Sequence, residues 1–259
     1  MLRIVDTHSH LFTEEFDADR AAVLKRAKEE GVTRIYMPNI DETTIDRLLQ
    51  VCEDNSGYCF PMMGLHPTSV NEHFEIALQQ VHQCLMAHRN PFVAVGEIGL
   101  DLYWDDTYLE QQMEVFDCQV RWALDLDLPI VVHCRKAIQY IYKVLFPYKN
   151  TALRGIFHSF TGDLEEAELM LQFERFMIGV NGIVTFKKSA LPAILPQIPV
   201  ERLVLETDAP YLTPVPHRGE RNESAYIRYT LIKIAEVLGV TPEELAEQTS
   251  ANAIQMFGA

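Results

Sequence analysis

Short apolar runs recur along the chain at near-regular intervals and alternate with segments of helical periodicity. Each run is rich in aliphatic or β-branched residues and is bounded by turn residues, which is typical of strands. We expect eight strands, over residues Arg3–His8, Thr33–Pro38, Tyr58–Leu65, Phe92–Glu97, Pro129–His133, Arg154–His158, Phe176–Val180 and Arg202–Glu206.

The segments between these strands carry apolar residues at helical spacing. Leu109, Met113, Phe116 and Val120 follow one another at intervals of three and four residues, the pattern of a helix with one buried face. Similar stripes cover the ranges Ala22–Ala27, Ile76–Leu85, Ile138–Leu145, Ala167–Leu171 and Ile227–Leu238. Strands that alternate with helices, at about 30 residues per unit, favour a parallel sheet, and eight units close a (β/α)8 TIM barrel. We therefore expect one barrel domain over residues 1–259.

The end of the chain carries a signal for one more helix. Thr241 can cap its first turn, Pro242 fits the first helical position, and Glu244 stands three residues after the cap. We expect this helix to cover the barrel wall.

Residues that can bind a metal stand at the ends of the predicted strands. They are His8, His10, Glu97, His133, His158 and Asp208. The carboxyl ends of barrel strands meet at one mouth, so these side chains should converge. A single histidine of this kind is better explained by a buried hydrogen bond. Their recurrence at the ends of five strands favours a shared metal site.

The chemistry of this set indicates divalent cations. Imidazole suits Zn, Fe, Ni or Mn, and carboxylates add harder oxygen ligands, so the set does not identify the metal. Six ligands are too many for one ion and fit two ions that share a carboxylate, for which we predict Glu97. We take Mg, Mn and Zn as the candidates.

Composition restricts the possible substrates and surroundings. A net charge of −15 excludes a broad basic surface that follows nucleic acid, so an anionic substrate must be captured locally. No apolar run approaches the roughly 18 residues of a membrane span, and the first residues do not resemble a signal peptide. The five cysteines are scattered and form no metal or redox motif. We expect a cytoplasmic protein with reduced cysteines, no membrane partner and a monomeric state.

Seven motifs connect this pattern with a known family. They are Asp6-Thr7-His8-Ser9-His10, Gly64-Leu65-His66-Pro67, Gly96-Glu97-Ile98-Gly99-Leu100-Asp101, His133-Cys134-Arg135, Phe157-His158-Ser159-Phe160-Thr161-Gly162, Glu206-Thr207-Asp208-Ala209-Pro210-Tyr211-Leu212 and Pro216-His217-Arg218-Gly219-Glu220-Arg221-Asn222-Glu223. In this order, and over nearly the whole chain, they resemble those of the TatD-like metal-dependent deoxyribonucleases, within the amidohydrolase-type barrels.

The resemblance implies a hydrolase of phosphodiester bonds that depends on divalent metal and acts from the 3′ end of single-stranded DNA. Carried over by position, one ion would be held by His8, His10, Glu97 and Asp208. The second would be held by Glu97, His133 and His158. Asp208 would also position or deprotonate the attacking water.

Substrate contacts are predicted less directly. Guanidinium groups match phosphate oxygens, so Arg135, Arg218 and Arg221, with His217, are candidates for phosphate contacts. The segment from His217 to Arg221 is equally consistent with a solvated loop. His66 follows a strand and is predicted to face the substrate or to support a ligand.

Three other residues bear on the site. Asp101 and Glu206 could orient ligands from behind. The family commonly has Arg-Asn-Glu-Pro in the late loop, whereas here Ser224 follows Glu223. This difference affects the shape of the loop and so the substrate preference.

Two other functions are compatible with the same pattern. One is the hydrolysis of a small amide, lactone or phosphoester, because the same two-ion site polarises many carbonyl and phosphoryl groups. Such relatives often bridge their ions with a modified lysine on strand four, where this chain has Glu97. The other is a scaffold that has lost its chemistry, which the complete ligand set disfavours.

Overall fold

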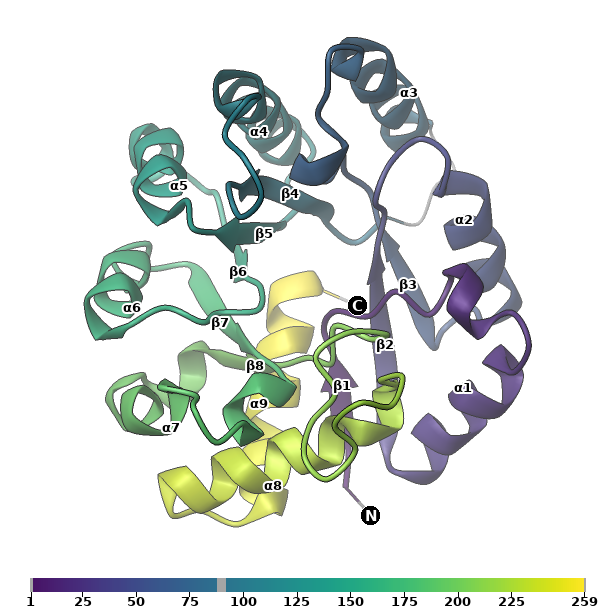
Figure 1. The fold of residues 1–259 in the computed structure, drawn as a ribbon, viewed down its shortest axis with the longest axis vertical. Helices are drawn as coiled ribbons and strands as arrows, with labels where there is room; N and C mark the ends of the chain where they lie inside the picture. Colours follow the sequence, from purple (N-terminus) through teal and green to yellow (C-terminus); the bar gives the residue numbers. More distant parts are fainter. Residues whose placement is uncertain (1, 88–91, 259) are drawn as a thin grey trace.

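Eight parallel strands form a ring surrounded by helices in the computed structural model, which describes residues 2–87 and 92–258 (Figure 1). The strands are β1 Ile4–Asp6, β2 Val32–Pro38, β3 Cys59–Met62, β4 Val95–Asp101, β5 Ile130–Arg135, β6 Gly155–Phe157, β7 Phe176–Val180 and β8 Leu203–Leu205. They run in chain order, with β1 to β3 in one sheet and β4 to β8 in the other.

Backbone hydrogen bonds connect the two sheets at both seams. Met63, after β3, pairs with Val95 in parallel register. On the other side, the N–H of Thr7 donates to the carbonyl of Leu205 at 3.0 Å. These contacts complete the ring, and the predicted barrel-type α/β fold is confirmed.

The helices cover the outside of the ring. They are α1 Arg20–Glu29, α2 Ile45–Asp54, α3 Phe74–Met86, α4 Leu109–Asp125, α5 Ile138–Leu145, α6 Leu164–Leu171, α7 Leu191–Ile194, α8 Ile227–Leu238 and α9 Pro242–Phe257. The bounds predicted for α5 and α8 agree with the structure, whereas α2 and the single turn α7 were not predicted. Each helix turns an apolar face inward, and in α2 this face consists of Leu48, Val51 and Cys52.

Two strands run further toward the barrel mouth than the sequence predicts. The β4–β5 ladder continues through the pairs Gly99 with His133 and Asp101 with Arg135. Glu97 and His133 therefore lie inside their strands, and the prediction that they end them was wrong.

The C-terminal helix α9 closes the bottom of the barrel. Its Met256 and Phe257 belong to a small buried cluster with Val5, Val131 and Val204, which come from strands around the ring. The ring of Phe257 stacks on that of Tyr36 of β2 with centroids 4.0 Å apart. The expectation that this helix covers the wall is corrected, because its last turn fills the apolar interior that short strands leave open.

Within residues 2–87 and 92–258, no helix combines enough length with enough apolar character to cross a bilayer.

Candidate metal centre

Glu97 is the carboxylate around which the polar side chains of the barrel mouth gather. The residue is 2% exposed. Its Oε2 lies 3.0 Å from His8 Nε2 and 3.7 Å from His10 Nε2, and these two nitrogens are 3.2 Å apart. Asp208 Oδ1 lies 3.7 and 3.6 Å from the same two nitrogens. Four donor atoms thus face one another at the separations found between ligands of one ion.

The other oxygen of Glu97 faces three further imidazoles. Its Oε1 lies 2.7 Å from His133 Nδ1, 3.4 Å from His66 Nε2 and 3.5 Å from His158 Nε2. His66, which the sequence predicts to face substrate or support a ligand, is thus as close to Glu97 as His158 is. The six predicted ligands meet at one centre, with His66 as a seventh member.

The backbone after β8 brings Asp208 to this centre. Asp208 adopts a φ of 57°, in the left-handed region that aspartate tolerates better than most residues. Its N–H donates to the carbonyl of His8 at 2.9 Å. The segment after β1 and the segment after β8 are therefore tied together beside the ligands they carry.

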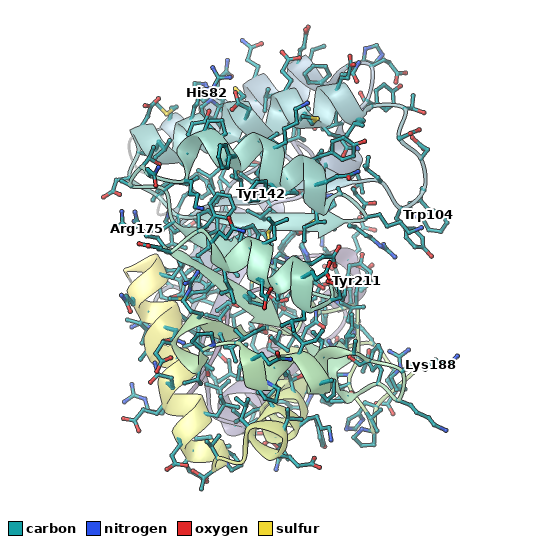
Figure 2. The ribbon with its side chains drawn as sticks, turned by 90° about the vertical axis from the view of Figure 1, so that its left-hand side faces the viewer. His82, Trp104, Tyr142, Arg175, Lys188 and Tyr211 are labelled. Atoms are coloured by element: carbon teal, nitrogen blue, oxygen red, sulfur yellow. The ribbon has the colours of Figure 1, made fainter. Side chains whose placement is uncertain are left out.

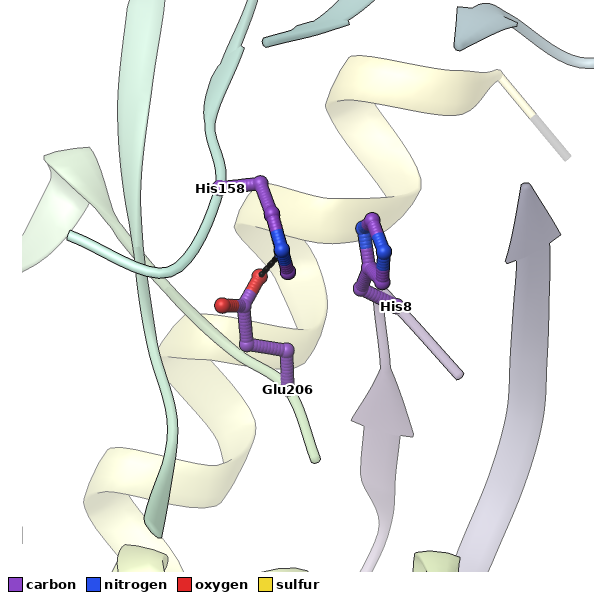
Figure 3. A group of neighbouring side chains, drawn as sticks. All are labelled: His8, His158 and Glu206. Carbon is purple, nitrogen blue, oxygen red and sulfur yellow. Dashed lines mark ion pairs between the residues drawn. The ribbon is translucent and has the colours of Figure 1, made fainter. Parts of the chain in front are cut away.

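Glu206 faces His158 at Nδ1 (Figure 3), whereas Glu97 faces the other ring nitrogen, Nε2. Its Oε2 lies 3.1 Å from His158 Nδ1, and its Oε1 accepts a hydrogen bond from the N–H of Ser159 at 2.6 Å. Gly179 makes room for this carboxylate, because a Cβ there would lie 2.4 Å from Oε2. The predicted role of Glu206 as a supporting residue agrees with these contacts.

Asp101 supports His133 in a comparable way. Its Oδ2 lies 2.9 Å from His133 Nε2, so this imidazole is held between two carboxylates, Glu97 and Asp101. The carboxylate of Asp101 is fixed in turn, since it accepts the N–H of Tyr103 at 2.9 Å. Partners of this kind set the orientation of metal-binding histidines.

The surroundings keep Glu97 and Asp208 ionised and His8 neutral, the protonation states in which these side chains bind metal. Burial opposes ionisation of Glu97, but the imidazoles of His8, His66 and His158 lower its pKa well below the usual range. Burial also opposes ionisation of Asp208, whose pKa is lowered chiefly by His158. Desolvation lowers the pKa of His8 and leaves its imidazole neutral.

Two histidines hold protons in the metal-free protein. Burial opposes this, but hydrogen bonds to Asp101 and Glu97 raise the pKa of His133 to about 9. The charges of Glu206, Glu97 and Asp208 likewise overcome burial and raise the pKa of His158 to about 10. An entering cation must displace these protons.

The nitrogen and oxygen donors at the barrel mouth are of the kinds that divalent metal ions bind. Histidine nitrogens and carboxylate oxygens converge on both sides of Glu97, and a third group of such donors joins His8, His158 and Glu206. Buried imidazole nitrogens and carboxylate oxygens at these separations are the donors that divalent transition metals bind.

A cavity of about 500 Å³ opens over this centre. Its lining includes His10, His66, Glu97, His133, His158 and Asp208, together with Arg135. The aromatic residues Trp104 and Tyr211 also line it, and the sequence analysis did not single them out. Tyr211 stands inside the motif from Glu206 to Leu212, and Trp104 follows β4, the strand that carries Glu97.

The structure places the other predicted phosphate contacts outside this lining. His217 bonds to Glu220 and stacks on Tyr226 with centroids 4.1 Å apart. Arg218 lies over the ring of Phe186, 3.8 Å from its centroid. Arg221 pairs with Asp19 at 2.7 Å. These partners hold the loop together, and the placement does not support phosphate contacts from the three residues.

Ser224 connects the same loop to β1. Its Oγ donates to Oδ2 of Asp6, a fully buried carboxylate, at 2.6 Å. The hydroxyl of Thr207 donates to the same oxygen at 2.7 Å. Burial raises the pKa of Asp6 to about 7, and Ser224, the residue at which this chain departs from the family pattern, helps to satisfy this buried carboxyl group two positions before His8.

The chain was compared with known proteins and families. Residues 5–258 match the family model described as TatD related DNase. The uncharacterized metal-dependent hydrolase YabD of Bacillus subtilis is 38% identical over 255 residues, 98% of both chains. The 3′-5′ ssDNA/RNA exonuclease TatD of Pantoea ananatis is 33% identical over 259 residues, 98% of both chains.

A solved structure shares the fold as well as the sequence. The TatD homologue YjjV of Escherichia coli superposes with a TM-score of 0.92 and 30% identity, covering 100% of this chain and 99% of that one.

Proposed function

This chain belongs to the TatD-related DNase family of metal-dependent hydrolases, and we propose that it removes nucleotides from the 3′ end of single-stranded DNA or RNA. The observation that supports this most strongly is the arrangement of donors on both sides of Glu97. One carboxylate that faces two groups of ligands is suited to bridge two cations.

We assign His8, His10, Glu97 and Asp208 to one ion and Glu97, His133 and His158 to the other. His66 stands beside the second group, 3.3 Å from His133 Nδ1, and can contact either the ion or the substrate. When bound, such ions supply an activated water and neutralise the charge that develops on the phosphoryl oxygens. Mg, Mn and Zn remain the candidates.

The residues of the chain have separable roles in this reaction. The side chain of Asp208 is 14% exposed, against 3% for Glu97, so Asp208 is the carboxylate that can accept a hydrogen bond from the attacking water. Glu206 and Asp101 keep His158 and His133 in orientation. Arg135, at the edge of the cavity, can pair with a phosphate of the strand.

The test uses metal-stripped protein and single-stranded oligonucleotides labelled at either end. Addition of Mg, Mn or Zn should produce stepwise shortening from the 3′ end. Asp208→Asn should abolish it, whereas Asp54→Asn, which alters an exposed carboxylate of α2, should not. Shortening from the 5′ end would refute the proposed polarity.

The same experiment tests the alternative substrate class. Absence of cleavage with every ion, in folded protein that binds metal, would refute the nuclease function and favour a small ester or amide.

A further inference from the structure

Two large aromatic side chains are exposed on the cavity side of the barrel (Figure 2). Trp104, in the loop after β4, is 81% exposed, and Tyr211, after β8, is 53% exposed. Both line the cavity above the metal centre. A tryptophan left in water beside an active site forgoes the stabilisation that burial provides, so it indicates a surface that a ligand covers.

Two cationic groups lie over the ring of Tyr103, the residue before Trp104. The guanidinium of Arg135 lies 3.7 Å from the centroid of the Tyr103 ring, and Lys136 Nζ lies 4.7 Å from it. Tyr103 also meets Trp104 edge to face, with centroids 4.8 Å apart. We call these four residues, Tyr103, Trp104, Arg135 and Lys136, the mouth rim.

The cations of the mouth rim are available to an anion. Among the residues that the structure describes, no ion pair joins Arg135 or Lys136 to a carboxylate, although the charge of Arg135 helps to lower the pKa of Asp101. Arginines elsewhere, such as Arg26 and Arg221, are paired with acids. In a chain with a net charge of −15, the guanidinium of Arg135 in the cavity lining, followed in the chain by Lys136, provides local attraction for a phosphate.

An exposed aromatic ring beside cationic groups matches the chemistry of a single nucleic-acid strand. An aromatic face stacks on a nucleobase whatever its sequence, and an adjacent guanidinium pairs with the phosphate of the same strand. A protein partner would require a larger continuous apolar patch than one indole surrounded by charges.

We propose that the mouth rim binds the strand just upstream of the scissile phosphodiester, with one base stacked on Trp104 and its phosphate held by Arg135 and Lys136. This proposal rests on the proposed nuclease function. It adds a base-stacking residue that determines how strongly the enzyme holds a strand of several nucleotides.

The test compares Trp104→Ala with Phe146→Ala, which removes another exposed aromatic residue from a short helical turn after α5. Cleavage is measured with metal present on two kinds of substrate. One is an intact oligonucleotide, and the other is a series of oligonucleotides that each lack one base, at increasing distance from the 3′ end. Trp104→Ala should lower kcat/KM for the intact strand about 5- to 100-fold, mainly through KM. Phe146→Ala should resemble the wild type, and Trp104→Phe should retain most of the activity.

The abasic series identifies the stacked base. At one position the missing base should lower kcat/KM for the wild type but have little further effect on Trp104→Ala. Binding is read independently with the Glu97→Gln variant, in which oligonucleotide should quench the fluorescence of Trp104, one of two tryptophans in the chain.

The outcomes separate the two proposals. Normal cleavage by Trp104→Ala, with the wild-type KM on every substrate, would overturn the mouth rim and leave the nuclease function standing. Failure of the wild type to cleave or bind any oligonucleotide would overturn both.

Discussion

Replacing Glu206 with glutamine should weaken metal binding without changing any of the six assigned ligands. Glu206 is fully buried, and its carboxylate lies 3.1 Å from His158 Nδ1. Glu206→Gln keeps the size of the side chain and can still accept the N–H of Ser159, but it removes the negative charge behind His158. The variant therefore tests the charge rather than the packing.

The expected magnitude follows from that contact. The partners behind metal-binding histidines show effects of about 10- to 100-fold. Glu206 also raises the pKa of His158, so below that pKa the wild type must release a proton before His158 can bind metal. The variant avoids part of this cost at low pH, which offsets part of its loss of affinity there. We expect a larger loss at about pH 9 than at about pH 7.

The assay is competition between the protein and a fluorescent chelator for Mn or Zn, at both pH values. Glu220→Gln is the matched control, since Glu220 pairs with His217 at 2.9 Å but its side chain is 60% exposed and lies outside the cavity lining. Thermal unfolding verifies that both variants are folded. Wild-type affinity of Glu206→Gln at both pH values would refute the positioning role of this carboxylate.

Three further predictions concern stability. Ser224→Ala should lower the free energy of unfolding in urea by about 1–3 kcal/mol, because the buried Asp6 carboxylate loses a hydrogen bond, and an unchanged value would contradict that role. Metal-free protein should lose thermal stability as the pH rises from about 6.5 through 9 and 10, because the raised pKa values of His133 and His158 let the folded state bind more protons than the unfolded state in this range. Metal-loaded protein should not show this decline. Equal pH profiles of Tm for the two forms would contradict this prediction. Phe257→Ala should cost about 3–5 kcal/mol in the same urea assay while leaving metal affinity intact, and a loss below about 1 kcal/mol would show that α9 does not close the barrel as described.

The order of strands and helices could be read from the sequence because it depends on local patterns. Apolar runs and helical stripes are properties of a few neighbouring residues, and their regular spacing leads to a parallel barrel. The barrel then predicts that residues at strand ends converge, which is why His8, Glu97, His133, His158 and Asp208 could be grouped. The cytoplasmic location, the single domain and the monomeric state stay predictions.

Only the tertiary structure decided how these groups face one another. The two oxygens of Glu97 are divided between two sets of histidines because of the path of β4, which no local pattern encodes. The pairing of Asp101 with His133 depends on the register of β4 against β5, and that of Ser224 with Asp6 joins residues 218 positions apart. Arg221, a plausible phosphate ligand by residue type, is held by Asp19. The sequence determines which chemistry is available, whereas ring closure selects the partners, because contacts between distant residues exist only once the barrel has formed.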